Sequence, residues 1–103
     1  MALFGRRRNK PGTLRTGTGS DTGHLEDFIR SRNGVEAFVE PRTTVTDTTI
    51  LLVAHDGEWT RRRVDGPHGA EAFAKKHSLP LYDAAVVGYP QRMRDFNARN
   101  KNR

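Results

Sequence analysis

The spacing of apolar side chains along the chain predicts two helices and allows a third. They are expected over residues 24–32, over residues 67–77, and from residue 90 onward. The first has Leu25, Phe28 and Ile29 on one face at helical spacing, and the second has a narrow apolar stripe centred on Phe73. The third can begin at Pro90, a residue suited to the first turn of a helix.

Alternating or β-branched positions predict four strands, over residues 35–40, 42–55, 58–64 and 81–87. The stretch VEAFVE alternates strictly, and the longest strand is rich in threonine before it becomes apolar at ILLVA. Asp56-Gly57 between the second and third strands is the dipeptide that a two-residue type I′ hairpin turn prefers. Gly88 is expected to end the last strand.

The element order is therefore α-β-β-β-α-β, with an optional helix at the end. A helix between the third and fourth strands makes those strands parallel if they share a sheet, with a right-handed crossover. We expect an α+β fold, in which a small, mixed and mostly antiparallel sheet has helices on one face and the chain has disordered basic termini.

The 103 residues, 34% of them hydrophobic, predict one domain with a small core. Residues 1–22 are rich in Gly, Thr and Arg and lack apolar periodicity, so we expect a disordered basic arm. Residues 23–97 are expected to form the single α+β domain, and residues 98–103 a frayed basic tail.

The net charge of +6 is concentrated at the two ends of the chain. Residues 1–22 and residues 90–103 each contain five basic residues and one acidic residue, whereas residues 23–89 contain eight basic and ten acidic residues. Flexible basic ends on a compact domain favour binding to nucleic acid through counterion release, although charge for solubility alone is the simpler alternative. We expect RNA or a ribonucleoprotein such as the ribosome, and the charge pattern does not distinguish RNA from DNA.

A second candidate surface lies on the strand DGEWTRRRV. Strand alternation puts Trp59, Arg61 and Arg63 on one face, where they could stack bases and contact phosphates. The alternative is a packed face, in which arginine stems cover Trp59 and pair with carboxylates such as Glu36 or Asp47. The candidate nucleic-acid-binding residues are Arg6, Arg7, Arg8, Lys10, Arg15, Trp59, Arg61, Arg63, Arg92, Arg94, Arg99, Lys101 and Arg103.

The sequence offers no catalytic residue, cofactor site or metal site that we can single out. It has no cysteine, no G-x-G-x-x-G loop and no metal-binding spacing among its four histidines. Its longest aliphatic run, ILLVA, is far shorter than a membrane span, and no secretory signal is present, so a cytoplasmic protein is expected. The alternative to nucleic acid is a protein partner, docked through an exposed strand.

The blocks FVEPRTTVT, DGEWTRRRV and GYPQRMRD resemble those of a group of short uncharacterised proteins of actinobacteria, often given the label oxidoreductase. The resemblance covers roughly residues 24–98 and brings no established activity or catalytic residues. An oxidoreductase therefore ranks behind nucleic-acid binding and a protein partner as a function. The element order also resembles the double-stranded RNA-binding domain, whose second helix begins with lysines that grip phosphates. Here the second helix begins GPHGAE, and Lys75 and Lys76 come at its end.

Overall fold

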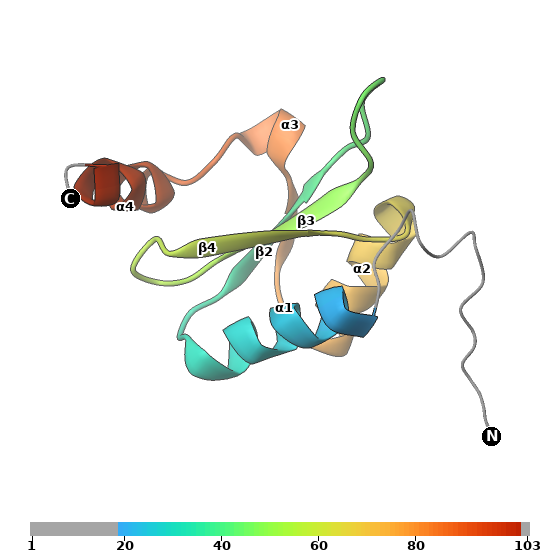
Figure 1. The fold of residues 1–103 in the computed structure, drawn as a ribbon, viewed down its shortest axis with the longest axis horizontal. Helices are drawn as coiled ribbons and strands as arrows, with labels where there is room; N and C mark the ends of the chain where they lie inside the picture. The colour runs from blue at the N-terminus through green and yellow to red at the C-terminus, as the bar shows by residue number, and fades with distance from the viewer. Residues whose placement is uncertain (1–18, 102–103) are drawn as a thin grey trace.

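The computed structural model describes residues 19–101 and shows an α+β fold built on one four-stranded sheet (Figure 1). The elements in chain order are α1 (Gly19–Ser31), β2 (Glu36–Glu40), β3 (Thr49–Val53), β4 (Trp59–Arg63), α2 (Gly66–Lys76), β5 (Leu81–Asp83), α3 (Ala84–Val87) and α4 (Gln91–Lys101). The strand order is β4-β3-β2-β5, with β3 antiparallel to both neighbours and β5 parallel to β2. β4 and β5 therefore run parallel, as the helix between them predicts.

The helices α1 and α2 cover one face of the sheet and lie on the same side of it in Figure 1. Leu25 and Phe28 from α1 and Ala70 and Ala74 from α2 share one buried cluster with alternate residues of β2 and β3, including Leu52. This is the face that the apolar stripes of the two helices predict.

The opposite face has helices as well, whereas the sequence predicted helices on one face only. The helix that the sequence allowed from Pro90 onward is confirmed as α4. Ala84 of α3 and Met93 of α4 pack with Phe38, Leu51 and Val53, which are the other alternate residues of β2 and β3. Met93 is only 6% exposed, so the C-terminal helix contributes to the core although most of its residues are polar. The sheet is thus covered on both sides.

The loop between β3 and β4 is longer than the two-residue type I′ turn expected at Asp56-Gly57. The amide of Gly57 donates to the carbonyl of Ala54 (3.0 Å), and the amide of Ala54 donates to the carbonyl of Glu58 (2.8 Å). Of the two turn residues only Gly57 has a positive φ, +95°, whereas a type I′ turn requires both. The result is a three-residue hairpin loop, residues 55–57.

The predicted strand over residues 42–55 is confirmed only at its apolar end, from Thr49 to Val53. Thr43 explains the difference, because its amide donates to the carbonyl of Thr46 (3.0 Å) and its hydroxyl accepts from the amide of Thr46 (3.0 Å). These local bonds give the backbone an alternative to strand pairing. Residues 42–48 consequently form a loop.

The predicted strand over residues 81–87 is likewise short. Its first three residues form β5, and Asp83 then accepts a hydrogen bond from the amide of Ala85 (2.8 Å). A carboxylate in this position caps a helix, which explains why residues 84–87 turn into α3.

Both terminal helices are longer than expected. α1 begins at Gly19, so residues 19–22 belong to the helix and not to the arm, and Asp21 in its first turn pairs with Arg62 of β4. α4 continues to Lys101, so residues 98–101 are helical and not a frayed tail. Acidic residues in a first turn and basic residues in a last turn favour a helix. The rest of the predicted arm and tail lies outside the described residues.

Candidate functional site

The helix α4 is attached to the β3–β4 hairpin by its arginines. Arg92 donates to the carbonyl of Ala54 (Nε, 2.9 Å) and to the carboxylate of Glu36 (Nη2, 2.6 Å), and Arg99 donates to the carbonyl of Asp56 (3.1 Å). Two of the candidate phosphate-binding arginines therefore have partners inside the protein. Arg92 in particular is a structural residue, because it is half-buried and joins α4 to both β2 and the end of β3.

Gly57 and Trp59 complete this hairpin–α4 contact. A Cβ atom at Gly57 would lie 2.0 Å from the carbonyl oxygen of Arg92, so the hairpin and the helix approach as closely as glycine allows. The indole nitrogen of Trp59 donates to Oδ1 of Asn97 (2.7 Å). The DGEWTRRRV and GYPQRMRD blocks meet here, which gives their residue types a structural explanation.

The face of β4 that holds Trp59 is packed and paired. Trp59 is half-buried against the buried cluster that contains Phe38 and Met93. The guanidinium carbon of Arg61 lies 5.2 Å from the centre of the Trp59 ring. Arg61 in turn donates two hydrogen bonds to Glu40 (2.6 and 2.8 Å), and Arg63 lies 3.8 Å from Asp47. These contacts correspond to the packed alternative for this strand, with Glu40 as the partner of Arg61 instead of Glu36.

Glu40 is the centre of a hydrogen-bond network on this face. Burial alone would raise the pKa of its carboxyl, but hydrogen bonds from Arg61, Tyr89 and Thr49 outweigh burial and lower the pKa below its ordinary value. The hydrogen bond to Glu40 and partial burial raise the pKa of Tyr89. The network joins β2, β3 and β4 to the connection between α3 and α4.

Most charges of the described residues are paired with each other. Residues 19–101 contain twelve Lys and Arg residues and all twelve Asp and Glu residues of the chain, so their formal net charge is zero. Seven carboxylates pair with Lys or Arg, namely Asp21, Glu26, Asp27, Glu36, Glu40, Asp47 and Glu58. The remaining positive charge is therefore restricted to a few positions.

Within residues 19–101, four basic side chains have neither a carboxylate nor a carbonyl partner: Arg42, Lys75, Arg94 and Lys101. Arg94 and Lys101 are candidates from the sequence, and their spacing of seven residues puts them on one face of α4. Arg42 and Lys75 were not among the candidates. Arg6, Arg7, Arg8, Lys10, Arg15 and Arg103 lie outside the described residues.

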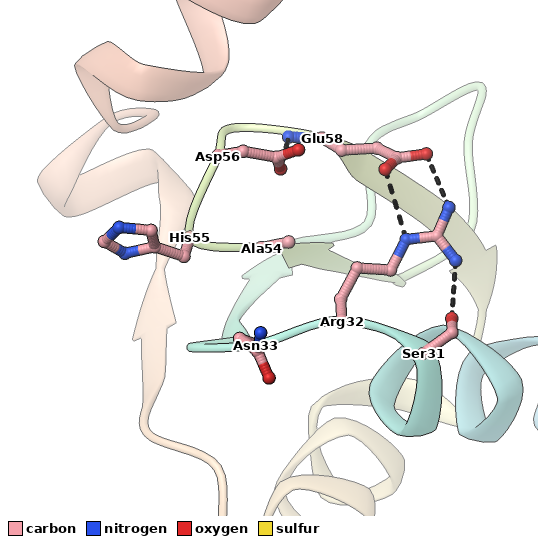
Figure 2. A pocket seen from close by; sticks show the side chains of 7 residues that line it. All are labelled: Ser31, Arg32, Asn33, Ala54, His55, Asp56 and Glu58. Atoms are coloured by element: carbon pink, nitrogen blue, oxygen red, sulfur yellow. Dashed lines mark hydrogen bonds and ion pairs between the residues drawn. The ribbon is translucent and has the colours of Figure 1, made fainter.

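A groove of about 530 Å³ lies between the end of α1 and the hairpin loop (Figure 2). Arg32 crosses it and donates to both oxygens of Glu58 (3.2 and 2.6 Å) and to the hydroxyl of Ser31 (2.6 Å). His55 is exposed and points away from this pair, so no carboxylate in the groove orients its ring for acid–base chemistry. The groove holds an ion pair and no arrangement typical of a catalytic site.

Two further grooves meet at Tyr89, a residue that the sequence did not single out. The first, which we call the aromatic groove, is lined by Phe38, Tyr82, Val87, Tyr89, Pro90 and Glu36 and has a volume of about 250 Å³. The second, the Arg42 groove, has a volume of about 620 Å³ and includes Arg42, Thr43, Arg61 and Tyr89. Tyr82 and Tyr89, the two tyrosines of the chain, both line the aromatic groove.

Residues 19–101 contain no group of three or more side chains able to ligate a metal ion. None of the helices in this part of the chain is long and apolar enough to cross a bilayer. Comparison with known proteins finds no matching family model, curated protein or solved structure. The geometry described above is therefore the basis for inferring a function.

Proposed function

We propose that the protein binds nucleic acid, RNA in preference to DNA, as a free strand or within a ribonucleoprotein. Contact is made by the outer face of α4 and by the basic ends of the chain. The observation that supports this most directly is the distribution of unpaired charge. The arginines of the sheet are paired with carboxylates, whereas Arg94 and Lys101 share one helix face without such partners.

The position of these two residues suits phosphate binding. Both are exposed, and the hairpin–α4 contact fixes the helix that presents them. Their charge adds to that of Arg103 and of the five basic residues at positions 6–15. When lysine and arginine side chains without protein partners bind the phosphates of a polyanion, the counterions are released into solution. This release favours association with any nucleic acid.

The strand that holds Trp59 gives less support to the proposal. The indole nitrogen is bonded to Asn97 and Arg61 is bonded to Glu40, so stacking a base on Trp59 would require these contacts to rearrange. Docking of a protein through an exposed strand also has less support. The edge strand β5 has only three residues, and the edge strand β4 carries three arginines, which discourage strand pairing.

The proposal is tested by fluorescence anisotropy with a labelled single-stranded RNA over a series of salt concentrations. The RNA is about 12 nucleotides long, which is within the length that one small domain covers. Lys101→Gln and Lys75→Gln form a matched pair, because each removes one exposed, unpaired lysine from the end of a helix. We expect Lys101→Gln to reduce the slope of log affinity against log salt by about 0.7, the value of one phosphate contact on a single strand. Lys75→Gln should leave the slope unchanged.

Replacing Arg6, Arg7 and Arg8 together with Gln tests the basic arm in the same assay. If each arginine binds one phosphate of a single strand, the triple variant should reduce the slope by about 2. Equal effects of Lys101→Gln and Lys75→Gln would show that only total charge matters. Absence of binding by the wild-type protein at about 50 mM salt, where electrostatic binding is strong, would refute the proposal.

A further inference from the structure

The aromatic groove and the Arg42 groove differ in charge, although Tyr89 lines both. In the aromatic groove the charged side chain is Glu36, which is paired with Arg92, so nothing there attracts a phosphate. In the Arg42 groove Glu40 is paired with Arg61 and Asp47 with Arg63. The uncompensated charge of that groove is therefore the guanidinium of Arg42.

The rings of the aromatic groove are accessible and held in place. Tyr82 is 39% exposed and Tyr89 38% exposed, so part of each ring is open to a binding partner. Tyr82 rests on Phe38, with ring centres 5.4 Å apart, and the hydroxyl of Tyr89 is bonded to Glu40. Rings that are fixed before binding lose little conformational entropy when a second ring stacks on them.

The size of the aromatic groove limits its occupant. Its volume of about 250 Å³ is below the roughly 300–1,000 Å³ of ordinary small-molecule pockets, so it suits one planar ring system. Because both grooves are lined by Tyr89, one ligand could place a ring in the aromatic groove and an anionic group in the Arg42 groove. A planar aromatic ring joined through a sugar to a phosphate is the chemistry of a nucleotide.

We propose that the aromatic groove holds one unpaired base of a nucleic-acid strand against Tyr82 and Tyr89, with a flanking phosphate directed to Arg42. This inference rests on the proposed function and gives it a substrate class, single-stranded nucleic acid. The groove ends at Pro90, directly before α4, and the amide of Arg94 is bonded to the carbonyl of Pro90 (3.4 Å). A strand leaving the groove therefore reaches Arg94, the first unpaired cation of α4, within about one helical turn.

The test uses the same single-stranded RNA with Tyr82→Ala, Tyr82→Phe and Val86→Ala. Loss of a stacking ring should lower the affinity of Tyr82→Ala roughly 5- to 150-fold without changing the salt slope, because stacking releases few counterions. Tyr82→Phe keeps the ring and should bind like the wild-type protein. Val86 is 79% exposed and does not line the groove, so Val86→Ala is a matched control for loss of exposed apolar surface.

Duplex RNA of the same length separates stacking from charge, since its bases are not available to a side groove. Tyr82→Ala should bind the duplex with wild-type affinity. If the wild-type protein binds single strands with a salt-dependent affinity and Tyr82→Ala does so equally well, the inference is wrong and the proposed function stands. If the wild-type protein binds no RNA, the proposed function itself fails.

Photocross-linking of the wild-type protein to a strand containing 4-thiouridine gives a measurement that needs no variant. Adducts at Tyr82 or Tyr89, mapped by mass spectrometry, would support the inference. Adducts confined to α4 and the chain ends would overturn it. Loss of a co-purifying protein from Tyr82→Ala with unchanged RNA binding would also overturn it, and would assign the groove to a protein partner.

Discussion

Replacing Gly57 with alanine tests the hairpin–α4 contact. The new Cβ atom would lie 2.0 Å from the carbonyl oxygen of Arg92 and 3.0 Å from Cβ of Phe96. Both are fixed parts of α4, so the overlap can be relieved only by moving the helix or the hairpin. The φ of +95° adds a backbone cost, because a side chain disfavours positive φ.

The expected cost can be estimated from these two effects. A positive φ costs an alanine roughly 1–2 kcal/mol. Displacing α4 breaks the bonds that Arg92 makes, and hydrogen bonds to a charged group contribute about 1.5–3 kcal/mol. Gly57→Ala should therefore destabilise the protein by about 3–5 kcal/mol. With a urea m-value near roughly 2 kcal/mol/M for a domain of this size, the unfolding midpoint should fall by about 2 M.

Two matched substitutions separate the causes. Gly66 has a φ of +68° and no atom within 4 Å of the position that a new methyl group would take, so Gly66→Ala should show the backbone cost alone. Gly23 lies inside α1 with open space around it, and Gly23→Ala should stabilise the protein by about 0.5–1 kcal/mol. Trp59 is the only tryptophan, so its fluorescence reports on the hairpin–α4 contact. Its emission should shift to longer wavelength in Gly57→Ala but not in Gly66→Ala or Gly23→Ala. Equal midpoints and equal spectra for Gly57→Ala and Gly66→Ala would refute the reasoning.

Two further predictions concern stability. The pKa of Glu40 is lower in the folded protein than in the unfolded chain, where it is about 4.3. The ionised carboxylate therefore stabilises the folded protein at pH values above the pKa of the unfolded chain. This stabilisation is lost as the pH falls through the pKa of the folded protein. Glu40→Gln should therefore show a weaker loss of stability than the wild-type protein as the pH falls from about 5, measured by urea unfolding, and an unchanged acid dependence would contradict the network. Leu52 is fully buried, so Leu52→Ala should lower the free energy of unfolding by about 2–5 kcal/mol. Phe73 is half-buried beside His77, so Phe73→Ala should cost less than the roughly 3–5 kcal/mol typical of a buried phenylalanine. Thermal melts in which Phe73→Ala is the more damaging change would show that α2 packs differently.

The sequence predicted those features of the fold that depend on local periodicity. The alternation of β4 correctly placed Trp59 and Arg61 on one face, which lies over Leu51 and Val53. The partner of Arg61 could not be predicted, because the strand register sets Arg61 level with Phe38, midway between Glu36 and Glu40 on the same face of β2. The contact with α4 makes the difference, because Arg92 bonds to Glu36 and Glu40 remains as the partner of Arg61.

Other features depend on contacts between distant parts of the chain. The aromatic groove forms because β5 pairs in parallel with β2, which sets Tyr82 beside Phe38 although the two are far apart in the sequence. No short-range pattern marks Tyr82 or Tyr89 for such a role. The hydroxyl of Thr43 is an intermediate case, since a β-branched residue favours a strand until its side chain bonds to the local backbone.

The pairing of charges within residues 19–101 also affects how copies of the protein behave toward one another. Residues 1–18 carry five positive charges and residues 102–103 carry one, which together equal the whole net charge of the chain. A chain shortened to residues 19–101 would therefore be close to its isoelectric point at neutral pH, where long-range repulsion between molecules vanishes and self-association is favoured. Residues 1–18 and 102–103, which are proposed to bind a polyanion, would therefore also supply the repulsion between copies of the protein.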